Sequence, residues 1–316
     1  MPDAPIVVVP VGVDDDALDA CLGALEAGTP AGTRVWLADD AQSGPRGHAI
    51  IERWIARTTL KADYTRRPRS VGEAVHLDEV LRACGDADVA VLAADSMPLP
   101  GWLGHLATCL RSDGAIATAT PWSNAGEAAA WPRIGEIDDG PADRERLARA
   151  AAQMPAAHPE LPAAVGHAVL LRGSARRRAG GLDTASYHSW YAALTDLSLR
   201  LTGLGWRNVL CERAFVARAG EGVPCDGDMQ RLSVRWPGWH ARLANFLMHD
   251  PLCAARGQLA TLMDTIAPPP PQADLFPRTV PAAMAPPASR RALAATVLAP
   301  VDAPQRSVEA TTEAVS

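Results

Sequence analysis

The sequence predicts an α/β domain in which helices cover both faces of a mostly parallel β-sheet. Two observations lead to this prediction. Short apolar runs rich in branched residues alternate, along the first half of the chain, with longer segments that carry apolar residues at helical spacing. Several of these runs also end in polar residues, as strands do where a parallel sheet presents a binding edge. Repeated strand–helix units form a parallel sheet because each right-handed crossover returns over the sheet.

Strand and helix candidates alternate through the first half of the chain. Branched apolar residues indicate strands at 6–11, 35–38, 64–66, 89–94 and 115–120, and helical spacing indicates helices at 17–25, 49–55, 75–81 and 101–110. The polar side chains that follow the strands are Asp39, Asp40, Arg66, Asp95, Ser123 and Asn124. Because the carboxyl ends of parallel strands meet at one edge of a sheet, we expect these side chains to converge there.

The second half of the chain has a different character. We expect a helix at 144–152, a strand at 168–171, a helix at 196–204, a pair of strands at 209–211 and 214–216, and a helical segment at 230–266 with an apolar face. From residue 267 onward proline and alanine dominate, with ten of the 27 prolines. Such a composition cannot bury enough apolar surface to fold alone. We therefore predict a domain at 1–266 and a disordered Pro/Ala-rich tail at 267–316, a short packed helix at 290–298 being the alternative.

Composition excludes several classes of protein. The chain has 316 residues, 30 Lys and Arg against 36 Asp and Glu, and a net charge of −6, which argues against nucleic-acid binding. The six cysteines form no CxxC pair and lie close to no histidine, so we expect reduced thiols, no zinc site and a cytoplasmic location. No run approaches the roughly 20 apolar residues that span a bilayer. Membrane contact is therefore expected to be peripheral, at the inner face of the membrane.

Ten short segments resemble, in their order and spacing, the family-2 glycosyltransferases, which have the GT-A fold. They are VVVPV at 7–11, LADDA at 37–41, LAADS at 92–96, PGWL at 100–103, TPWSN at 120–124, VGHAVLLR at 165–172, GGLD at 180–183, DLSLR at 196–200, GWR at 205–207 and PGWH at 237–240. The resemblance implies a GT-A sandwich with a mostly parallel central sheet and C-terminal helices. It also implies a nucleotide-diphospho-sugar as donor.

The resemblance implies roles for particular residues. The nucleoside would be held at the end of the first strand by Pro10 and Val11 and at the end of the second by Asp39 and Asp40. Asp95 would hold the diphosphate or its divalent cation, Mn²⁺ or Mg²⁺. The acceptor would lie against residues of later segments, namely Trp122, Asn124, Asp183, Trp190 and Tyr191.

The sequence departs from the family pattern at its catalytic positions. Met97 stands where a second acidic residue would help to hold the cation, and Arg218 stands where a late histidine would complete the metal shell. The paired acidic residues that carry the general base align with Ala193 and Leu194. Asp196, three residues after Ala193, is then the best remaining base candidate, and Arg218 becomes a candidate to neutralise the diphosphate in place of a cation.

Two functions remain open from the sequence. The first is hexosyl transfer from a nucleotide-diphosphate donor to a glycan or lipid-linked acceptor, in cell-surface polysaccharide assembly. The second is a catalytically degenerate GT-A protein that binds or scaffolds active transferases. Plain structural roles also stay open for single residues: Asp39 and Asp40 could fix a turn, Asp196 could cap a helix, and Trp122 could pack in the core.

Overall fold

The computed structural model describes residues 4–137, 143–220, 224–225 and 227–267. Its central feature is an eight-stranded sheet with the strand order β3-β2-β1-β4-β7-β6-β8-β5. The strands are β1 (Ile6–Val11), β2 (Arg34–Asp39), β3 (Lys61–Arg66), β4 (Val89–Leu92), β5 (Ser96–Pro98), β6 (Ile116–Trp122), β7 (Ala168–Leu171) and β8 (Arg207–Arg218). The predicted tail lies, apart from Ala267, outside the described residues.

The sheet is mostly parallel, as predicted. Strands β1 to β4 pair in parallel, and so do β6 and β8. Strand β7 runs antiparallel to both β4 and β6, and short β5 runs antiparallel to the end of β8. The sheet therefore joins a parallel N-terminal half to a mixed C-terminal half.

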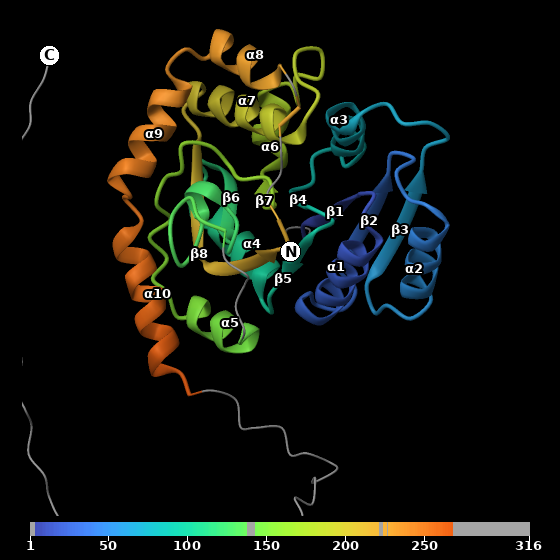
Figure 1. The fold of residues 1–316 in the computed structure, drawn as a ribbon, viewed down its shortest axis with the longest axis horizontal. Helices are drawn as coiled ribbons and strands as arrows, with labels where there is room; N and C mark the ends of the chain where they lie inside the picture. Colours follow the sequence, from blue (N-terminus) through green and yellow to red (C-terminus); the bar gives the residue numbers. More distant parts are fainter. Residues whose placement is uncertain (1–3, 138–142, 221–223, 226, 268–316) are drawn as a thin grey trace, which may run out of the picture. The chain divides into compact units, whose positions relative to one another are not determined.

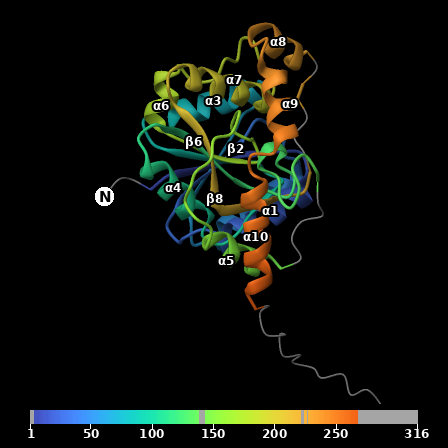
Figure 2. The same ribbon diagram turned by 90° about the vertical axis from the view of Figure 1, so that its left-hand side faces the viewer.

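Helices cover both faces of this sheet (Figures 1 and 2). They are α1 (Asp15–Gly28), α2 (Pro45–Ile55), α3 (Glu73–Ala83), α4 (Trp102–Ser112), the short 3₁₀ turn η1 (Glu127–Ala129), α5 (Arg144–Ala152), α6 (Gly173–Arg178), α7 (Trp190–Gly203), α8 (Asp228–Arg235), α9 (Trp239–His249) and α10 (Cys253–Thr265). Figure 1 shows α9 and α10 on the side of the molecule opposite α1 and α2.

The alternation of side chains along β1 explains the two main cores. Val7, Val9 and Val11 pack with α1, α2 and α4 on one face of the sheet. Ile6 and Val8 point to the other face, where they pack with apolar side chains of α3 and α7. A strand with both faces buried is apolar along its whole length, as the sequence of β1 is. A third core lies between β8, α5 and α10.

The structure corrects several predicted elements of the second half. Residues 209–216 do not form a pair of strands but belong to the single 12-residue strand β8. The two charged residues in its middle, Glu212 and Arg213, suggest a turn, yet Glu212 is buried and accepts hydrogen bonds from the backbone N–H groups of Ala157 (3.1 Å) and His158 (3.0 Å). The predicted 230–266 helix is three helices, and α7 begins six residues before its predicted start.

Candidate active site

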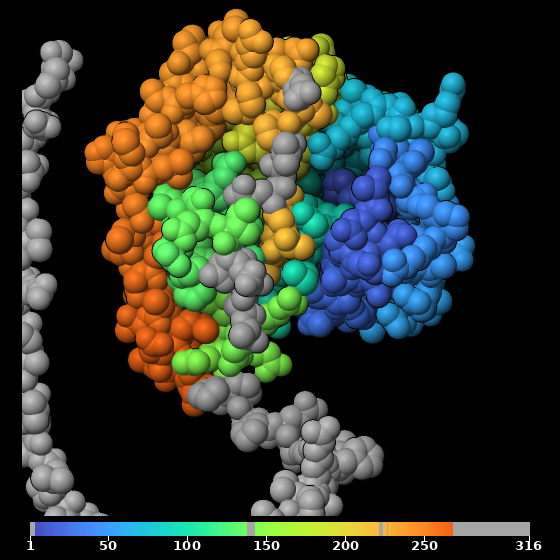
Figure 3. Space-filling model, in the orientation of Figure 1, coloured from blue at the N-terminus to red at the C-terminus, as the bar shows by residue number. Residues whose placement is uncertain are grey.

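A cavity of about 220 Å³ opens at the carboxyl ends of β1 and β4. Its walls come from the end of β1, the start of α1, the segment after β4, the first residues of α3 and α7, and the end of β8. The lining residues are Pro10, Gly12, Val13, Asp14, Ala17, Glu73, Val91, Ala93, Ala94, Asp95, Trp190 and Arg218. Figure 3 shows a hollow between the blue and cyan N-terminal part and the yellow part of the surface. We refer to it as the donor cavity, after the donor site that the sequence analysis expects at this edge of the sheet.

Asp95 and Arg218 meet in this cavity. Strand β5 pairs antiparallel with β8, so that Ser96 lies opposite Arg218, and the backbone N–H of Ala219 donates to the carbonyl oxygen of Asp95 at 3.0 Å. The Nε of Arg218 donates to both carboxylate oxygens of Asp95, at 3.1 and 2.9 Å. Two residues that the sequence analysis placed at the diphosphate thus form one ion pair.

Asn124 holds the main chain of Arg218. Its Oδ1 accepts the backbone N–H of Arg218 at 2.7 Å, and its Nδ2 donates to the Arg218 carbonyl oxygen at 2.9 Å. A side-chain amide that bonds both backbone groups of one residue fixes that residue as a neighbouring strand would. Asn124, predicted on the acceptor side, therefore positions Arg218 at the donor cavity.

Glu73 is a cavity residue that the sequence analysis did not single out. It is the first residue of α3, and its Oε2 accepts the backbone N–H of Trp190, the first residue of α7, at 2.8 Å. Desolvation of the carboxylate by the surrounding protein raises the pKa of Glu73. The hydrogen bond from Trp190 and the positive charge of Arg218 act to lower it but do not outweigh the desolvation. A lone acidic residue after a glycine carries no sequence signal of such a role.

Asp39 ends β2 outside the lining of the donor cavity. Its buried carboxylate accepts the backbone N–H of Gln42 at 2.7 Å, the hydroxyl of Tyr64 at 2.9 Å and the hydroxyl of Ser43. Burial acts to raise the pKa of Asp39, but these hydrogen bonds outweigh it and hold the pKa below its ordinary value. Asp39 fixes the turn after β2, which is the structural role that the sequence left open.

Asp40 is bound to the segment that leads into α3. Its carboxylate accepts the hydroxyl of Ser70 at 2.6 Å and the backbone N–H groups of Val71 and Gly72, each at 2.9 Å. Burial alone would raise the pKa of Asp40, yet the bonds from these three residues keep it below the ordinary value. Asp40 therefore fixes the backbone immediately before Glu73.

Asp196 does not line the donor cavity and has a different set of contacts from those expected of a base. It lies inside α7, whose N-cap is Ser189, so the capping alternative is wrong. Its fully buried carboxylate accepts Nε of Arg200 at 2.7 Å and Nε1 of Trp236 at 2.9 Å, and Nε of Arg235 lies 3.2 Å away. With both oxygens held by these donors, the carboxylate serves to join α7 to α8.

Two other residues predicted on the acceptor side also have structural contacts. Trp122 is fully buried, with the guanidinium of Arg256 at 5.4 Å from its ring centroid, so it belongs to the core and cannot stack on an acceptor sugar. Asp183 accepts the backbone N–H of Ser186 at 3.1 Å and pairs with Arg235. These bonds hold the pKa of Asp183 below its ordinary value against the raising effect of burial.

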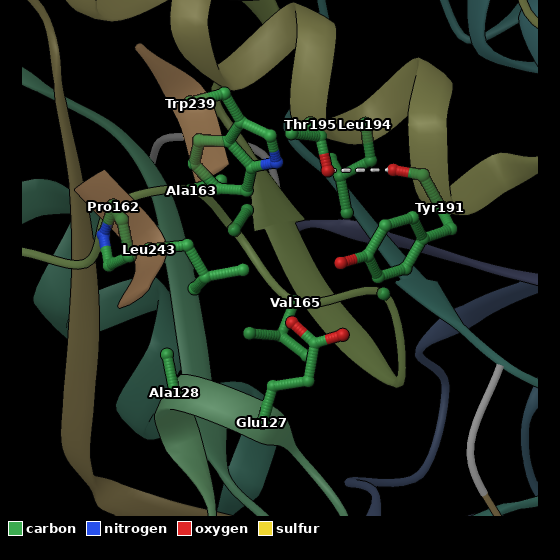
Figure 4. Close-up of a pocket in the computed structure, with 12 residues that line it drawn as sticks. Glu127, Ala128, Pro162, Ala163, Val165, Tyr191, Leu194, Thr195, Trp239 and Leu243 are labelled. Atoms are coloured by element: carbon green, nitrogen blue, oxygen red, sulfur yellow. Dashed lines mark hydrogen bonds between the residues drawn. The ribbon is translucent and has the colours of Figure 1, made fainter. Parts of the chain in front are cut away.

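A second, smaller cavity lies beside the first. Its volume is about 20 Å³, enough for one water-sized group. Figure 4 shows its wall, which includes Glu127, Val165, Tyr191, Leu194 and Trp239. Trp190 of the donor cavity precedes Tyr191, and its Nε1 donates at 3.1 Å to the carbonyl oxygen of Gly166, which also lines the second cavity. The two cavities are therefore neighbours at the start of α7.

The profile of the family described as Glycosyl transferase family 2 matches residues 6–178, more than half of the chain. The chain belongs to glycosyl transferase family 2. This membership confirms the family that the segments at 7–172 predict. Among curated proteins, none gives a significant match.

Two solved structures of glycosyltransferases resemble the fold of this family-2 member. The mannosyltransferase PcManGT from Pyrobaculum calidifontis, in complex with GDP-Man and Mn²⁺, is 16% identical, with a TM-score of 0.53 over 83% of this chain and 74% of that one. GalNAc-T7 with UDP, GalNAc and Mn²⁺ is 13% identical, with a TM-score of 0.56 over 83% of this chain and 56% of that one. At these identities the likeness shows the GT-A fold.

The residues of this glycosyltransferase do not fit the divalent cation that its fold family implies. Both carboxylate oxygens of Asp95 already accept from Arg218, and Met97 packs against the third core and offers only a thioether, which is a poor ligand for a hard cation. Throughout the ranges that the structure describes, there is no cluster of three or more His, Cys, Asp or Glu side chains that could hold a metal. Among the described residues that line the donor cavity, Arg218 is the one that carries a positive charge.

The two residues that the sequence analysis aligns with the family's base, Ala193 and Leu194, carry no carboxylate. Ala193 is fully buried, and the side chain of Leu194 lines the second cavity. In addition, none of the described helices is long and apolar enough to cross a membrane.

Proposed function

We propose that this family-2 member is an active hexosyltransferase that moves a sugar from a nucleotide-diphosphate donor to a glycan or lipid-linked acceptor. The observation that carries this proposal is the donor cavity at the carboxyl edge of the sheet, with the Asp95–Arg218 pair at its centre. Ligands of open α/β sheets bind at this edge. The resemblance to a mannosyltransferase bound to GDP-Man and to GalNAc-T7 bound to UDP supports a nucleotide-sugar as the ligand.

Arg218 is the residue we assign to the diphosphate. A guanidinium offers several N–H donors in a planar fork that matches phosphate oxygens, and it remains charged at every physiological pH. In the structure its partner is Asp95. The incoming diphosphate would compete with Asp95 for the guanidinium, so Asp95 would orient Arg218 before the donor binds.

The nucleoside would lie towards β1 and β2. Pro10 lines the donor cavity, and Val11 follows it on β1 with its side chain in the core. Asp39 and Asp40 order the segments that border this region, and we propose that they shape the nucleoside site through the backbone they hold. Trp190 in the donor cavity and Tyr191 in the second cavity would lie on the acceptor side.

The chemical step follows from this placement. The acceptor oxygen attacks the anomeric carbon of the donor sugar, a new C–O bond forms, and the bond from that carbon to the phosphate oxygen breaks. The electron pair of the broken bond leaves with the nucleoside diphosphate, where Arg218 stabilises the developing negative charge. We further propose that this reaction belongs to cell-surface polysaccharide assembly in the cytoplasm, at the inner face of the membrane.

Calorimetric titration with UDP, GDP and dTDP, each with and without Mn²⁺, tests the donor site. We expect one of these nucleotides to bind equally well without Mn²⁺, and Arg218→Ala to weaken that binding at least tenfold. Arg133→Ala is the matched control, because Arg133 is exposed and pairs with Glu136 on the surface. Absence of binding to every nucleotide would contradict the proposal, and binding without release of nucleotide from any sugar donor would favour the scaffold alternative.

A further inference from the structure

Glu127 lines the same small cavity as Leu194 of α7. Among the described residues that line the second cavity it is the acidic one, and Leu194, which the sequence analysis aligns with a base residue of the family, lines the same cavity. Figure 4 shows the Glu127 side chain extending from the loop after β6 towards the side chain of Tyr191 on α7. The other lining residues are mainly apolar, apart from the hydroxyl groups of Tyr191 and Thr195, so Glu127 brings the charged group among the described lining residues.

The backbone of Glu127 is held in a conformation that does not suit its residue type. Its φ is +44°, in the left-handed region that glycine adopts without strain and that costs a residue with a Cβ about 1 kcal/mol. Glycine would be the easier residue here. Strain that persists at one position points to a use for the side chain at that position.

Surrounding hydrogen bonds impose this conformation on the loop. The buried guanidinium of Arg256, from α10, donates to the carbonyl oxygens of Ala130 at 2.6 Å and Ala128 at 3.0 Å. The backbone of Ser123 pairs with the same loop, accepting the N–H of Trp131 at 2.8 Å and donating to Ala129 at 3.0 Å. A catalytic carboxylate needs this kind of fixed support.

The loop of Glu127 also reaches the donor cavity. Asn124, three residues earlier, makes the two hydrogen bonds that hold the main chain of Arg218. On the opposite wall, Trp190 lines the donor cavity while Tyr191, the next residue, lines the second one. A hydroxyl placed in the second cavity therefore lies next to the donor cavity.

We infer that Glu127 is the general base of this transferase and takes the proton from the acceptor hydroxyl. The inference rests on the proposed function. As the acceptor oxygen forms its bond to the anomeric carbon, its proton moves to the carboxylate of Glu127, and the nucleoside diphosphate leaves with the electron pair. The second cavity is the size of the one hydroxyl that has to be deprotonated.

Release of nucleotide from UDP-Glc, UDP-GlcNAc and GDP-Man by the full chain, with water or a panel of methyl glycosides as acceptor, tests the inference. Glu127→Gln keeps the shape and the backbone strain, and we expect it to lower kcat at least 100-fold. Nucleotide affinity and Tm should stay at the wild-type values. Glu127→Gly should be equally slow while its Tm is at least that of the wild type. Glu136→Gln, an exposed change nearby, should keep kcat within twofold.

Each other result overturns the inference in a recognisable way. A Glu127→Gln enzyme with kcat within threefold of the wild type removes Glu127 from the chemical step but leaves the transferase function intact. Loss of nucleotide binding or of Tm in that variant would show a structural role instead. A wild-type protein that releases no nucleotide from any of the three donors overturns the transferase function and the base together.

Discussion

The Nε of Arg218 donates to both carboxylate oxygens of Asp95, at 3.1 and 2.9 Å, at the place where the sequence analysis expects a diphosphate or its cation. The guanidinium of Arg218 can neutralise part of the charge of a diphosphate without a bound metal. The same pair also explains why the Asp95 carboxylate is not available as an isolated ligand. We therefore expect metal dependence to turn on the two positions at which the sequence departs from the family pattern, Met97 and Arg218.

Restoring the family pattern at these two positions should convert the site to metal dependence. In the double variant Met97→Asp with Arg218→His, two carboxylates and an imidazole replace one ion pair, which is a donor set suited to Mn²⁺. We expect nucleotide binding to fall at least tenfold without Mn²⁺ and to recover when Mn²⁺ is added. Titration calorimetry measures both values. Equal binding with and without Mn²⁺ in this variant would contradict the assignment of Arg218.

Asp196→Asn should reduce stability rather than catalysis. The substitution leaves Arg200 and Arg235 without their carboxylate inside a joint between α7 and α8, which we expect to cost about 2 kcal/mol in the free energy of unfolding. Urea denaturation measures the loss. Asp19→Asn breaks an exposed ion pair with Arg53 and should change stability by less than about 0.5 kcal/mol. An Asp196→Asn variant that is as stable as the wild type but has no turnover would show that Asp196 acts in catalysis.

Glu73 should make donor binding dependent on pH. Because the pKa of Glu73 is raised above its ordinary value, the carboxylate takes up a proton at a higher pH than a glutamate of the unfolded chain does. Below that raised pKa it is neutral, and above it the negative charge lies in the donor cavity with Asp95 and Arg218 and repels a diphosphate. Affinity for the donor should therefore increase as the pH falls through this pKa, and Glu73→Gln should remove the increase.

The measurement is the Kd of UDP-GlcNAc and GDP-Man at several pH values between 5 and 8, since neither sugar diphosphate ionises in that range. The free energy of unfolding should change with pH in the same direction as the affinity for the donor. The raised pKa means that folding is most favourable below the ordinary glutamate pKa and loses that contribution as the pH rises through the raised value. Glu73→Gln should thus be at least as stable as the wild type at pH 8. An unchanged pH profile of Kd would exclude Glu73 as a neighbour of the diphosphate.

The sequence predicts most of the fold because both faces of the central strands are buried. Such strands can be recognised in the sequence as continuous apolar runs, as at Ile6–Val11. Strand β5 is missed because its three residues include a proline and gain their pairing only from β8. Helix α7 is placed too late because its first residues, Trp190 and Tyr191, are aromatic residues that face the two cavities.

The site is less predictable than the fold because its contacts join distant segments. Asp95 and Arg218 are each recognisable, but they lie 123 residues apart and meet only through the β5–β8 pairing. Asp196 belongs to a segment that resembles the family, while its partners Arg235 and Trp236 lie at the end of α8. Glu73 and Glu127 belong to no motif, so only the positions of their helices and loops bring them to the cavities.

Moving the carboxylate across the second cavity should rescue the Glu127→Gln enzyme. Leu194 faces the same cavity from α7, at the position where the family pattern has an acidic residue. The double variant Glu127→Gln with Leu194→Asp places a carboxylate on the opposite wall, and we expect at least tenfold more nucleotide release than from Glu127→Gln alone. Leu194→Asn in the same background is the matched control, because it introduces a polar group of similar size without a base. Equal rates for the Asp and Asn variants, at melting temperatures that show both to be folded, would contradict a proton-accepting role for this cavity.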